Sequence, residues 1–422
     1  MKKYNSTPLI VGHPFAPIGR GEDARAAFRS FHTAMFTLPI RDIVPLSDMD
    51  MDIKLELDGH LVSYLSDTVN IFFINGDEIA PILARLKNEM SSRSYNIIYP
   101  AWELSIYPSE WASQLELFGE VWAQSRFVYE SLKRAVSKPV HYLPLAAEVN
   151  ISSFLDRRYF GIPESSYVFL FFFDFTSYIA RKNPLDVLKA FEKVCRKRPG
   201  EDVRLVIKTG GATQRREDYI RIKEAFDRFP YKDRLIFISK TLSNNEIKNL
   251  VRCCDCFISL HRSEGFGRGM AEAMFLGKPV IATGYSGNLD FMNDENSCLV
   301  SYDLVPLTEG QYPHWCGQVW AQPDIDQAVG YMLKLLSDRN YGRGIGTAAS
   351  RYLRTFFSYR AIGLQYKKRI DEILKMRAFN DKDLITRVQG YEDTPEKQER
   401  FRRARTFQAE VGAYSRTGRP LL

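Results

Sequence analysis

Short apolar runs alternate with amphipathic helical patterns over most of the chain. Apolar runs of strand length lie at 9–11, 70–74, 96–99, 121–123 and 141–143 in the first part, and at 168–173, 204–208, 235–239, 256–260, 279–282 and 298–300 in the second. Many of them are apolar on both faces, as are parallel strands that helices cover on both sides. The alternation of strand and helix predicts an α/β protein with parallel sheets.

Helix signals follow several of these runs. An apolar stripe at helical spacing follows the first strand and consists of Ala24, Phe28, Phe31, Met35 and Leu38. Asn183 and Pro184 have the residue types of an N-cap and a first helical position. Ser243 and Glu246 have the spacing of a capping box, which predicts a helix that begins near Asn244.

The strands fall into two series, and the length of 422 residues favours two or three domains. No clean strand lies between 145 and 165, so we expect one domain over 1–150 and a second over 151–355. If two such sheets face each other, a cleft lies between the carboxyl ends of their strands. Ligands bind at that edge of parallel sheets.

Composition excludes several classes of protein. Hydrophobic residues make up 45% and charged residues 26%, which excludes a largely disordered or collagenous chain. The six cysteines do not have the spacing of a secreted disulfide framework. Cys253, Cys254 and Cys256 could be metal ligands, but the run LVRCCDCFISL resembles a helix end that passes into a buried strand. We therefore expect core cysteines there.

Charge and targeting signals point to the cytoplasm. The net charge of +7 favours an anionic ligand or surface and does not by itself indicate nucleic acid. The N-terminus lacks the apolar stretch of a signal peptide, and the apolar run at 167–175 is too short to span a bilayer. Residues 397–419 hold seven basic and two acidic residues. A solvated helix face, a frayed tail and a contact with anionic lipid on the inner face of the membrane all fit this stretch.

The segment from 260 to 291 carries the clearest chemistry. Gly265, Gly267 and Gly269 form a turn between a strand and a helix, and they let the backbone approach a ligand closely. The free N–H groups at the start of that helix make an anion site. Glu264 and Glu272 lie eight residues apart on either side of the turn. Carboxylates only accept hydrogen bonds, so the pair suits sugar hydroxyls beside a phosphate.

This segment resembles the E-x7-E signature of glycosyltransferase family 4, and other stretches are similar to a bacterial polysaccharide-type subgroup of it. The resemblance implies a retaining enzyme of the GT-B fold: two Rossmann-like domains with parallel sheets facing across a cleft. A helix within 356–378 would cross back to the first domain, and residues 379–422 lie outside the resemblance. Glu264 would hold the donor hexose and Glu272 the ribose. Backbone N–H groups of Phe266, Gly267 and Arg268 would bind the donor phosphates.

Two further stretches match the family's donor site. Lys182 stands at the position of the phosphate-binding lysine, with Arg181 beside it just before the expected helix. The Gly-Arg pair that the family usually carries earlier in this loop is not evident. In the first domain, Gly19 and Gly21 resemble the glycine loop that approaches the donor phosphate.

The acceptor side is expected in the first domain. Trp102 and Glu103 combine an aromatic face with a carboxylate, which suits a sugar, although the tryptophan fits a core position equally well. The family often has a donor-contacting histidine after its fourth strand, whereas this chain has FFINGDEIA there. Asn75 or Asp77 would stand in for it.

Asp48, Asp50 and Asp52 form a DMDMD run that mimics a metal motif of another glycosyltransferase fold. The run lies in a polar loop far in sequence from the donor signature. GT-B enzymes generally need no metal, so we expect no metal and no other cofactor.

The resemblance implies a retaining hexosyltransferase that acts in polysaccharide or surface-glycan synthesis. Its partners would be a nucleotide sugar, with GDP-mannose favoured, and a glycan or lipid-linked acceptor. A nucleotide-sugar 2-epimerase and a non-catalytic sugar-binding subunit remain alternatives. No motif supports nucleic-acid binding.

Overall fold

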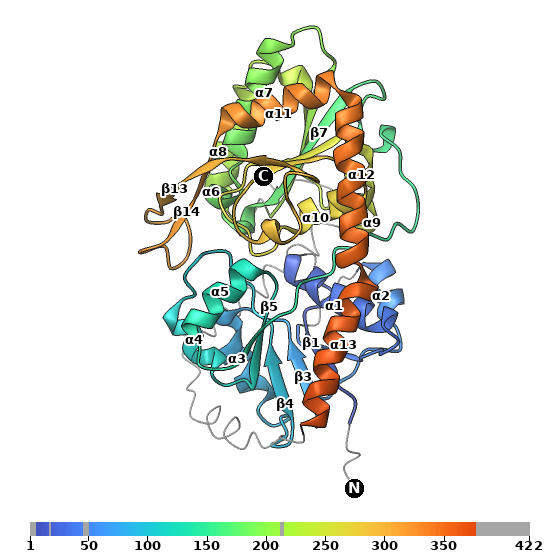
Figure 1. Cartoon of the computed structure of the whole chain (residues 1–422), viewed down its shortest axis with the longest axis vertical. Coiled ribbons are helices and arrows are strands. Elements are labelled where there is room, and N and C mark those ends of the chain that lie inside the picture. Colours follow the sequence, from blue (N-terminus) through green and yellow to red (C-terminus); the bar gives the residue numbers. More distant parts are fainter. Residues whose placement is uncertain (1–5, 17, 45–49, 212–214, 377–422) are drawn as a thin grey trace. The chain divides into compact units, whose positions relative to one another are not determined.

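The computed structural model describes residues 6–16, 18–44, 50–211 and 215–376 (Figure 1). The chain divides into two compact units. Unit 1 runs from Met1 to Ala146 and resumes at Phe356, and unit 2 is Ala147–Thr355. The basic stretch at 397–419 and Asp48 of the DMDMD run lie outside the described residues.

Unit 1 is built on a six-stranded parallel sheet with the strand order β2-β1-β3-β4-β5-β6. The strands are β1 (Leu9–Gly12), β2 (Ile40–Asp42), β3 (Val69–Phe72), β4 (Tyr95–Ile98), β5 (Glu120–Ala123) and β6 (Val140–Tyr142). Every one except β2 lies at a predicted apolar run. β2 has only three residues and is fully buried only at Ile40, so it leaves little pattern in the sequence.

Helices cover both faces of this sheet. They are α1 (Gly19–Thr33), α2 (Met51–Leu57), α3 (Ile79–Leu86), α4 (Ser109–Leu115), α5 (Arg126–Ala135) and α13 (Tyr359–Lys375), with a 3₁₀ turn η1 (Gly76–Glu78). α13 packs against α1 so closely that a Cβ on Gly363 would lie 1.9 Å from the carbonyl oxygen of Ser30. Tyr366 of α13 donates a hydrogen bond to the carbonyl of Pro144 at 2.8 Å. The late helix α13 is therefore part of the first unit.

Unit 2 has a second six-stranded parallel sheet, with the order β12-β11-β10-β7-β8-β9. Its strands are β7 (Tyr167–Asp174), β8 (Val203–Gly210), β9 (Leu235–Ile238), β10 (Cys256–Ser259), β11 (Val280–Thr283) and β12 (Cys298–Val300). All of them lie at predicted runs. The structure adds an antiparallel pair that the sequence pattern did not indicate, β13 (Tyr302–Pro306) with β14 (Val319–Pro323).

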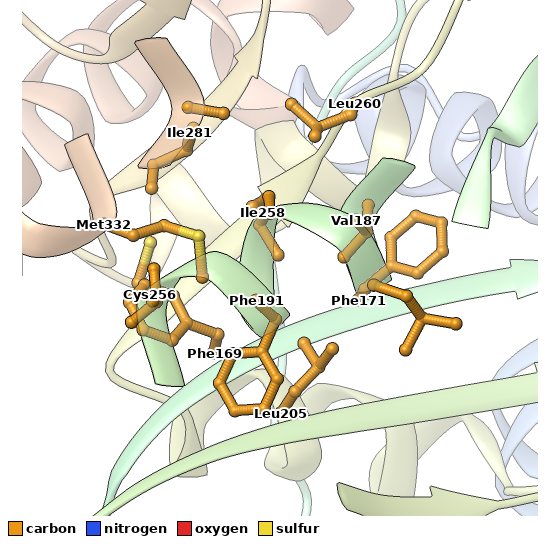
Figure 2. Packing of buried hydrophobic residues seen from close by; sticks show 14 of the residues in the cluster. Phe169, Phe171, Val187, Phe191, Leu205, Cys256, Ile258, Leu260, Ile281 and Met332 are labelled. Carbon is orange, nitrogen blue, oxygen red and sulfur yellow. The ribbon is translucent and has the colours of Figure 1, made fainter. Parts of the chain in front are cut away.

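The helices of unit 2 follow its strands in alternation. They are α6 (Ile179–Lys182), α7 (Pro184–Lys197), α8 (Arg216–Asp227), α9 (Asn244–Cys253), α10 (Arg268–Phe275), α11 (Ile325–Ser337) and α12 (Arg339–Phe356), with the 3₁₀ turns η2 (Arg158–Phe160), η3 (Phe175–Ser177), η4 (Lys232–Arg234) and η5 (Gly287–Asp290). Figure 2 shows the core between sheet and helices, where Phe169 and Ile258 from strands meet Phe191 of α7 and Met332 of α11. Cys256 lies in this core, as predicted.

Two local predictions need correction. Met35 was placed on the apolar stripe of α1, but α1 ends at Thr33 and Met35 is 90% exposed at a positive φ of 57°. Asn183 does occupy the N-cap position of α7, but its side chain makes no capping bond. It donates instead to Asp186 and to the carbonyl of Leu260, both at 2.9 Å. The capping box of Ser243 and Glu246 at α9 is confirmed.

Asp50 and Cys254, from the two candidate metal motifs, lie at the N-cap of α2 and at the C-cap of α9. Asp50 caps α2, because its side chain accepts a hydrogen bond from the Asp52 N–H at 3.0 Å. Burial raises the pKa of the Cys254 thiol to about 12. Within the described residues, no group of three or more His, Cys, Asp or Glu side chains is arranged to hold a metal ion. No helix in that part of the chain combines the length and the apolarity needed to cross a membrane.

Candidate functional site

Two loops at one edge of the unit 2 sheet form the candidate site. β7 and β10 are parallel neighbours, so the loops that follow them start at the same edge. The N–H of Arg262, after β10, donates to the carbonyl of Arg181, after β7, at 2.8 Å. Nη1 of Arg181 donates to the carbonyl of Ser263 at 2.9 Å. These contacts bring the two predicted donor-site stretches together.

Both predicted cations converge on Glu264. Nζ of Lys182 lies 2.5 Å from Oε1 of Glu264, and Nη1 of Arg181 lies 3.1 Å from Oε2. Arg181 and Glu264 are buried, whereas the Lys182 side chain is one-fifth exposed. Burial raises the pKa of the Glu264 carboxyl, but the charges of Lys182 and Arg181 outweigh it and lower the pKa to about 2. Glu264 is therefore ionised at neutral pH, with a cation on each oxygen.

The main chain of Glu264 is held by the loop after β11. Its N–H donates to Oγ of Ser286 at 2.8 Å, and its carbonyl accepts from the N–H of Gly287 at 2.9 Å. Ser286 has φ 77° and ψ −146°, a conformation that L-residues rarely adopt. Such backbone costs about 1–3 kcal/mol and persists only where its surroundings hold it. Strain of this kind is common at functional sites.

Helix α10 begins four residues after Glu264, with Gly267 as its N-cap. Gly267 has φ 95°, and a Cβ there would lie 2.5 Å from Cε of Met270, so glycine is required. Phe266 is buried, and its ring packs on Phe291 at 5.2 Å between centroids. The N-terminal N–H groups and the helix dipole make this turn favourable for an anion.

Glu272, the second glutamate of the motif, forms an ion pair that sequence analysis missed. It lies buried on α10, where Nζ of Lys248 on α9 donates to its Oε1. Lys248 is itself buried. A signal for it existed, because the capping box at Ser243 places Lys248 on the same helix face as the apolar Val251. A lysine on a core-facing position needs an anionic partner.

His261 lies beside the cluster but is fully hydrogen-bonded within the fold. Its Nε2 is 3.1 Å from Oδ1 of Asn288 and 3.2 Å from the carbonyl oxygen of Tyr285. Burial lowers the pKa of its imidazole. The neutral ring therefore ties the β10 loop to the β11 loop.

In the glycine loop of unit 1, only one of the two glycines is required by the space around it. A Cβ on Gly21 would lie 2.1 Å from the carbonyl oxygen of Ala16, so only glycine fits there. A Cβ on Gly19 would meet no atom within 4 Å. Close backbone approach thus explains Gly21, and the structure offers no steric reason for Gly19.

The predicted acceptor residues of unit 1 are partly core. Trp102 is buried, and its ring packs edge-on against Tyr107 at 5.8 Å and Trp111 at 5.3 Å. Glu103 and Asn75 are half-buried, and Asp77 is exposed. Trp102 therefore belongs to a buried aromatic group, whereas Glu103 is half-buried and Asp77 is exposed.

A charged cluster in unit 1 was not predicted from the sequence. Nε2 of His13, just after β1, lies 3.0 Å from Oε1 of Glu78, in the loop after β3. Burial raises the pKa of Glu78, but the contact with His13 and the hydrogen bond from the Asn75 N–H outweigh this and leave the pKa below its usual value. Arg20, at the start of α1, donates to Asp23 at 2.9 Å and to the carbonyl of Tyr99. The only sequence signal was the density of charges in RGEDAR on a helix with an apolar stripe.

Part of the chain is similar to a known protein family. Residues 154–351 match the family described as Glycosyl transferases group 1. No curated protein sequence matches the chain.

Several solved structures resemble most of the chain. Anabaena Alr3699/HepE in complex with UDP and glucose is 13% identical, with a TM-score of 0.63, over 86% of this chain and 99% of that one. Sucrose-phosphate synthase from Thermosynechococcus elongatus is 13% identical, with a TM-score of 0.64, over 88% and 100%. A glycosyltransferase from Rickettsia africae is 15% identical, with a TM-score of 0.60, over 88% and 99%. At these identities the likeness shows the fold, which is GT-B, and residues 154–351 are similar to the Glycosyl transferases group 1 family.

Proposed function

We propose that the protein is a retaining glycosyltransferase that moves a hexose from a nucleotide sugar to a glycan or glycolipid acceptor in polysaccharide or surface-glycan synthesis. The observation that carries the proposal is the meeting of Arg181, Lys182 and Glu264 beside the N-terminus of α10. Two cations and a helix N-terminus suit a pyrophosphate, and a fixed carboxylate suits sugar hydroxyls. The HepE structures contain UDP with glucose and UDP-glucose, which supports a nucleotide sugar as donor.

Lys182 and Arg181 are assigned to the charge that develops on the departing pyrophosphate. Preorganised donors aimed at developing charge lower a barrier without any reorganisation at the moment of reaction. The backbone N–H groups of Phe266, Gly267 and Arg268 would add to them. Because these cations can neutralise the negative charge of the pyrophosphate, we propose that transfer needs no metal and no other cofactor.

Glu264 is assigned to the hexose hydroxyls and not to proton transfer. A carboxylate with a pKa of about 2 is a weak base, so it is a poor proton acceptor at neutral pH. We therefore propose attack by the acceptor on the same face from which the pyrophosphate leaves, with the leaving phosphate taking the acceptor proton. No residue is assigned as a nucleophile.

Glu272 is assigned to the ribose of the donor nucleotide. Lys248 donates to Oε1 of Glu272 and thereby orients the carboxylate. We propose that Oε2 accepts the hydrogen bonds of the ribose hydroxyls. In unit 1, Glu103, Asp77 and Asn75, in loops built around Trp102, are assigned to the acceptor side, and the loop of Gly19 and Gly21 to the donor phosphate.

The donor screen that tests this proposal measures the melting temperature of the protein with GDP-mannose, UDP-glucose and dTDP-sugars. A ligand at 100 times its Kd stabilises the folded state by roughly 2.7 kcal/mol. The stabilising donor is then incubated with and without glycan acceptors, in the presence of a chelator, and the anomeric configuration of the product is determined by NMR. We expect a retained configuration, and acceptor-dependent release of nucleoside diphosphate.

Three outcomes would contradict the proposal. Stabilisation by none of these sugar nucleotides would exclude a donor site. Conversion of the donor to its 2-epimer without an acceptor would identify an epimerase. Donor binding with no turnover on any acceptor would indicate a sugar-binding subunit.

A further inference from the structure

The β13–β14 hairpin is the part of unit 2 that does not belong to its six-stranded sheet. It lies between β12 and α11, and Figure 1 shows it on the opposite side of unit 2 from α12. The loop between its strands is closed by a hydrogen bond from the Leu307 N–H to the Gln318 carbonyl at 3.0 Å. Tyr312 of that loop is buried although it lies at the loop's centre. A buried tyrosine at a loop tip indicates that the loop packs against something specific.

One strand of the hairpin is attached to the candidate site through Arg262. The carbonyl of Arg262 accepts from the N–H of Ala321 on β14 at 2.9 Å, and its own N–H donates to Arg181. Its guanidinium lies 5.3 Å from the ring centroid of Trp320 and donates to Gln322 at 2.8 Å. A single residue thus connects β14 to the main chain of a proposed phosphate-binding cation.

A second connection runs through side chains. Nε2 of Gln322 donates to Oδ2 of Asp186 at 2.9 Å, and the same oxygen accepts from Nδ2 of Asn183. Asn183 directly follows Lys182 and has φ 55°, a left-handed conformation that needs support from its surroundings. Through Asp186, the hairpin therefore helps to hold Asn183, and the backbone of Asn183 fixes the direction in which Lys182 enters the site.

The loop of the hairpin makes the third connection. The ring of Tyr312 lies 4.8 Å from the ring of Tyr178, and 5.9 Å from the guanidinium carbon of Arg181. Tyr178 begins the turn into α6 with φ 59°, and its ring also contacts the guanidinium of Arg215 at 3.9 Å. Two of the four residues that lead into Lys182, Tyr178 and Arg181, thus contact the ring of Tyr312.

We propose that Tyr312 is a positioning residue, through which the β13–β14 hairpin holds Arg181 and Lys182 in the orientation that binds the donor pyrophosphate. The inference rests on the proposed function, because it presumes that these cations bind phosphate. The ring of Tyr312 acts through Arg181 by a cation–π contact and through Tyr178 by a tilted contact between the two rings. Tyr312 itself is assigned no contact with the donor.

Three variants test this. Tyr312→Leu keeps an apolar side chain but removes the ring, Tyr312→Phe keeps the ring, and Leu304→Ala changes an exposed residue of β13 as the matched control. For each we would measure the Kd of the nucleoside diphosphate that wild type binds, kcat, and the melting temperature. Loss of a desolvated cation–π contact weakens binding by about tenfold. We expect this loss in both Kd and kcat for Tyr312→Leu, values within about threefold of wild type for Tyr312→Phe, and no change for Leu304→Ala.

A double-mutant cycle separates positioning from general stability. If Tyr312 acts through Arg181, the loss caused by Tyr312→Leu shrinks in an Arg181→Met background, because the cation that the ring contacts is already gone. Gln322→Asn on β14 shortens the link to Asp186, and we expect the same loss of binding and turnover from it. This variant replaces Tyr312→Leu if the latter does not fold. Wild-type Kd and kcat in Tyr312→Leu, or purely additive effects in the cycle, would overturn the inference. Failure of wild type to bind any nucleoside diphosphate would instead refute the proposed function, and the inference with it.

Discussion

At the scale of single residues, the charged groups of the candidate site stabilise one another in their ionised forms. Glu264 is buried, and burial by itself raises the pKa of its carboxyl. The cations of Arg181 and Lys182 reverse that direction and keep it ionised. The same contact orients both cations, since each binds a different oxygen. The cluster is thus preorganised before any ligand contributes.

Lys182→Ala is expected to lower kcat by on the order of a hundredfold, because loss of one preorganised donor costs about that much in other enzymes. Lys182→Arg should recover only part, since a planar fork does not replace a compact ammonium. Lys193→Ala is the control, because Lys193 also pairs with a carboxylate, Asp326, at 2.6 Å but is exposed. Steady-state kinetics on the identified donor measure all three. Wild-type kcat in Lys182→Ala would show that this lysine is only a surface charge.

The depressed pKa of Glu264 predicts a pH dependence of stability. Its folded-state pKa of about 2 lies below the ordinary value of 4.5, so ionised Glu264 stabilises the fold above pH 4.5. That contribution is lost as the pH falls from 4.5 toward 2. The melting temperature of Glu264→Gln, which cannot titrate here, should therefore fall less than that of wild type across this window. Parallel curves for the two proteins would contradict the pKa assignment.

At the scale of elements, α9 and α10 are joined by a buried ion pair that links the donor motif to its neighbour. Removing one member of such a pair leaves an uncompensated buried charge, whereas replacing both by apolar residues is often tolerated. The pair of Lys248 and Glu272 therefore couples the stability of two helices to the orientation of a proposed ribose ligand.

Lys248→Met should destabilise the protein by about 3–5 kcal/mol, and adding Glu272→Met should restore much of the loss. The double variant should nevertheless bind free nucleoside diphosphate more weakly than wild type, because the ribose contact is gone. Chemical denaturation and calorimetric titration measure the two effects. Lys193→Met, at an exposed pair, should cost no more than about 1 kcal/mol. Equal stability of Lys248→Met and Lys193→Met would mean that the buried pair contributes nothing.

The packing of α13 on α1 gives a second prediction at this scale. Gly363→Ala would place a Cβ 1.9 Å from the Ser30 carbonyl oxygen, so the helices must separate, at a cost of about 1–3 kcal/mol. Gly344→Ala in α12 meets no atom within 4 Å and should stabilise its helix by up to about 1 kcal/mol. Opposite signs in urea unfolding are expected. Stabilisation by both substitutions would show that α13 does not pack as described.

At the scale of the whole molecule, the expected membrane contact concerns residues outside the described part of the chain. Deletion of 377–422 removes the seven-to-two basic excess of 397–419 and leaves all described elements in place. Each basic residue near an anionic surface contributes about 1 kcal/mol, so the deletion should weaken sedimentation with anionic liposomes. Turnover on a soluble acceptor should not change. Equal sedimentation of both forms, or binding to neutral vesicles alone, would refute a lipid-binding tail.

The sequence by itself determined most of the framework of this protein, because each central parallel strand carries its own apolar run and needs no partner to be recognised. The glycine turn between Glu264 and Glu272 was equally local, since close backbone approach and a positive φ demand glycine.

Tertiary structure alone decided the contacts that join distant segments. Lys182 and Glu264 are 82 residues apart, and Lys248 and Glu272 are 24 apart, so no local spacing shows that they pair. β2 and the β13–β14 hairpin escaped detection for the same reason. These strands have no continuous apolar run that would reveal them in the sequence. Each is held by hydrogen bonds to a neighbouring strand. The loop of Lys182 and the loop of Glu264 could each be picked out in the sequence, but only folding and the attraction of their charges bring them together.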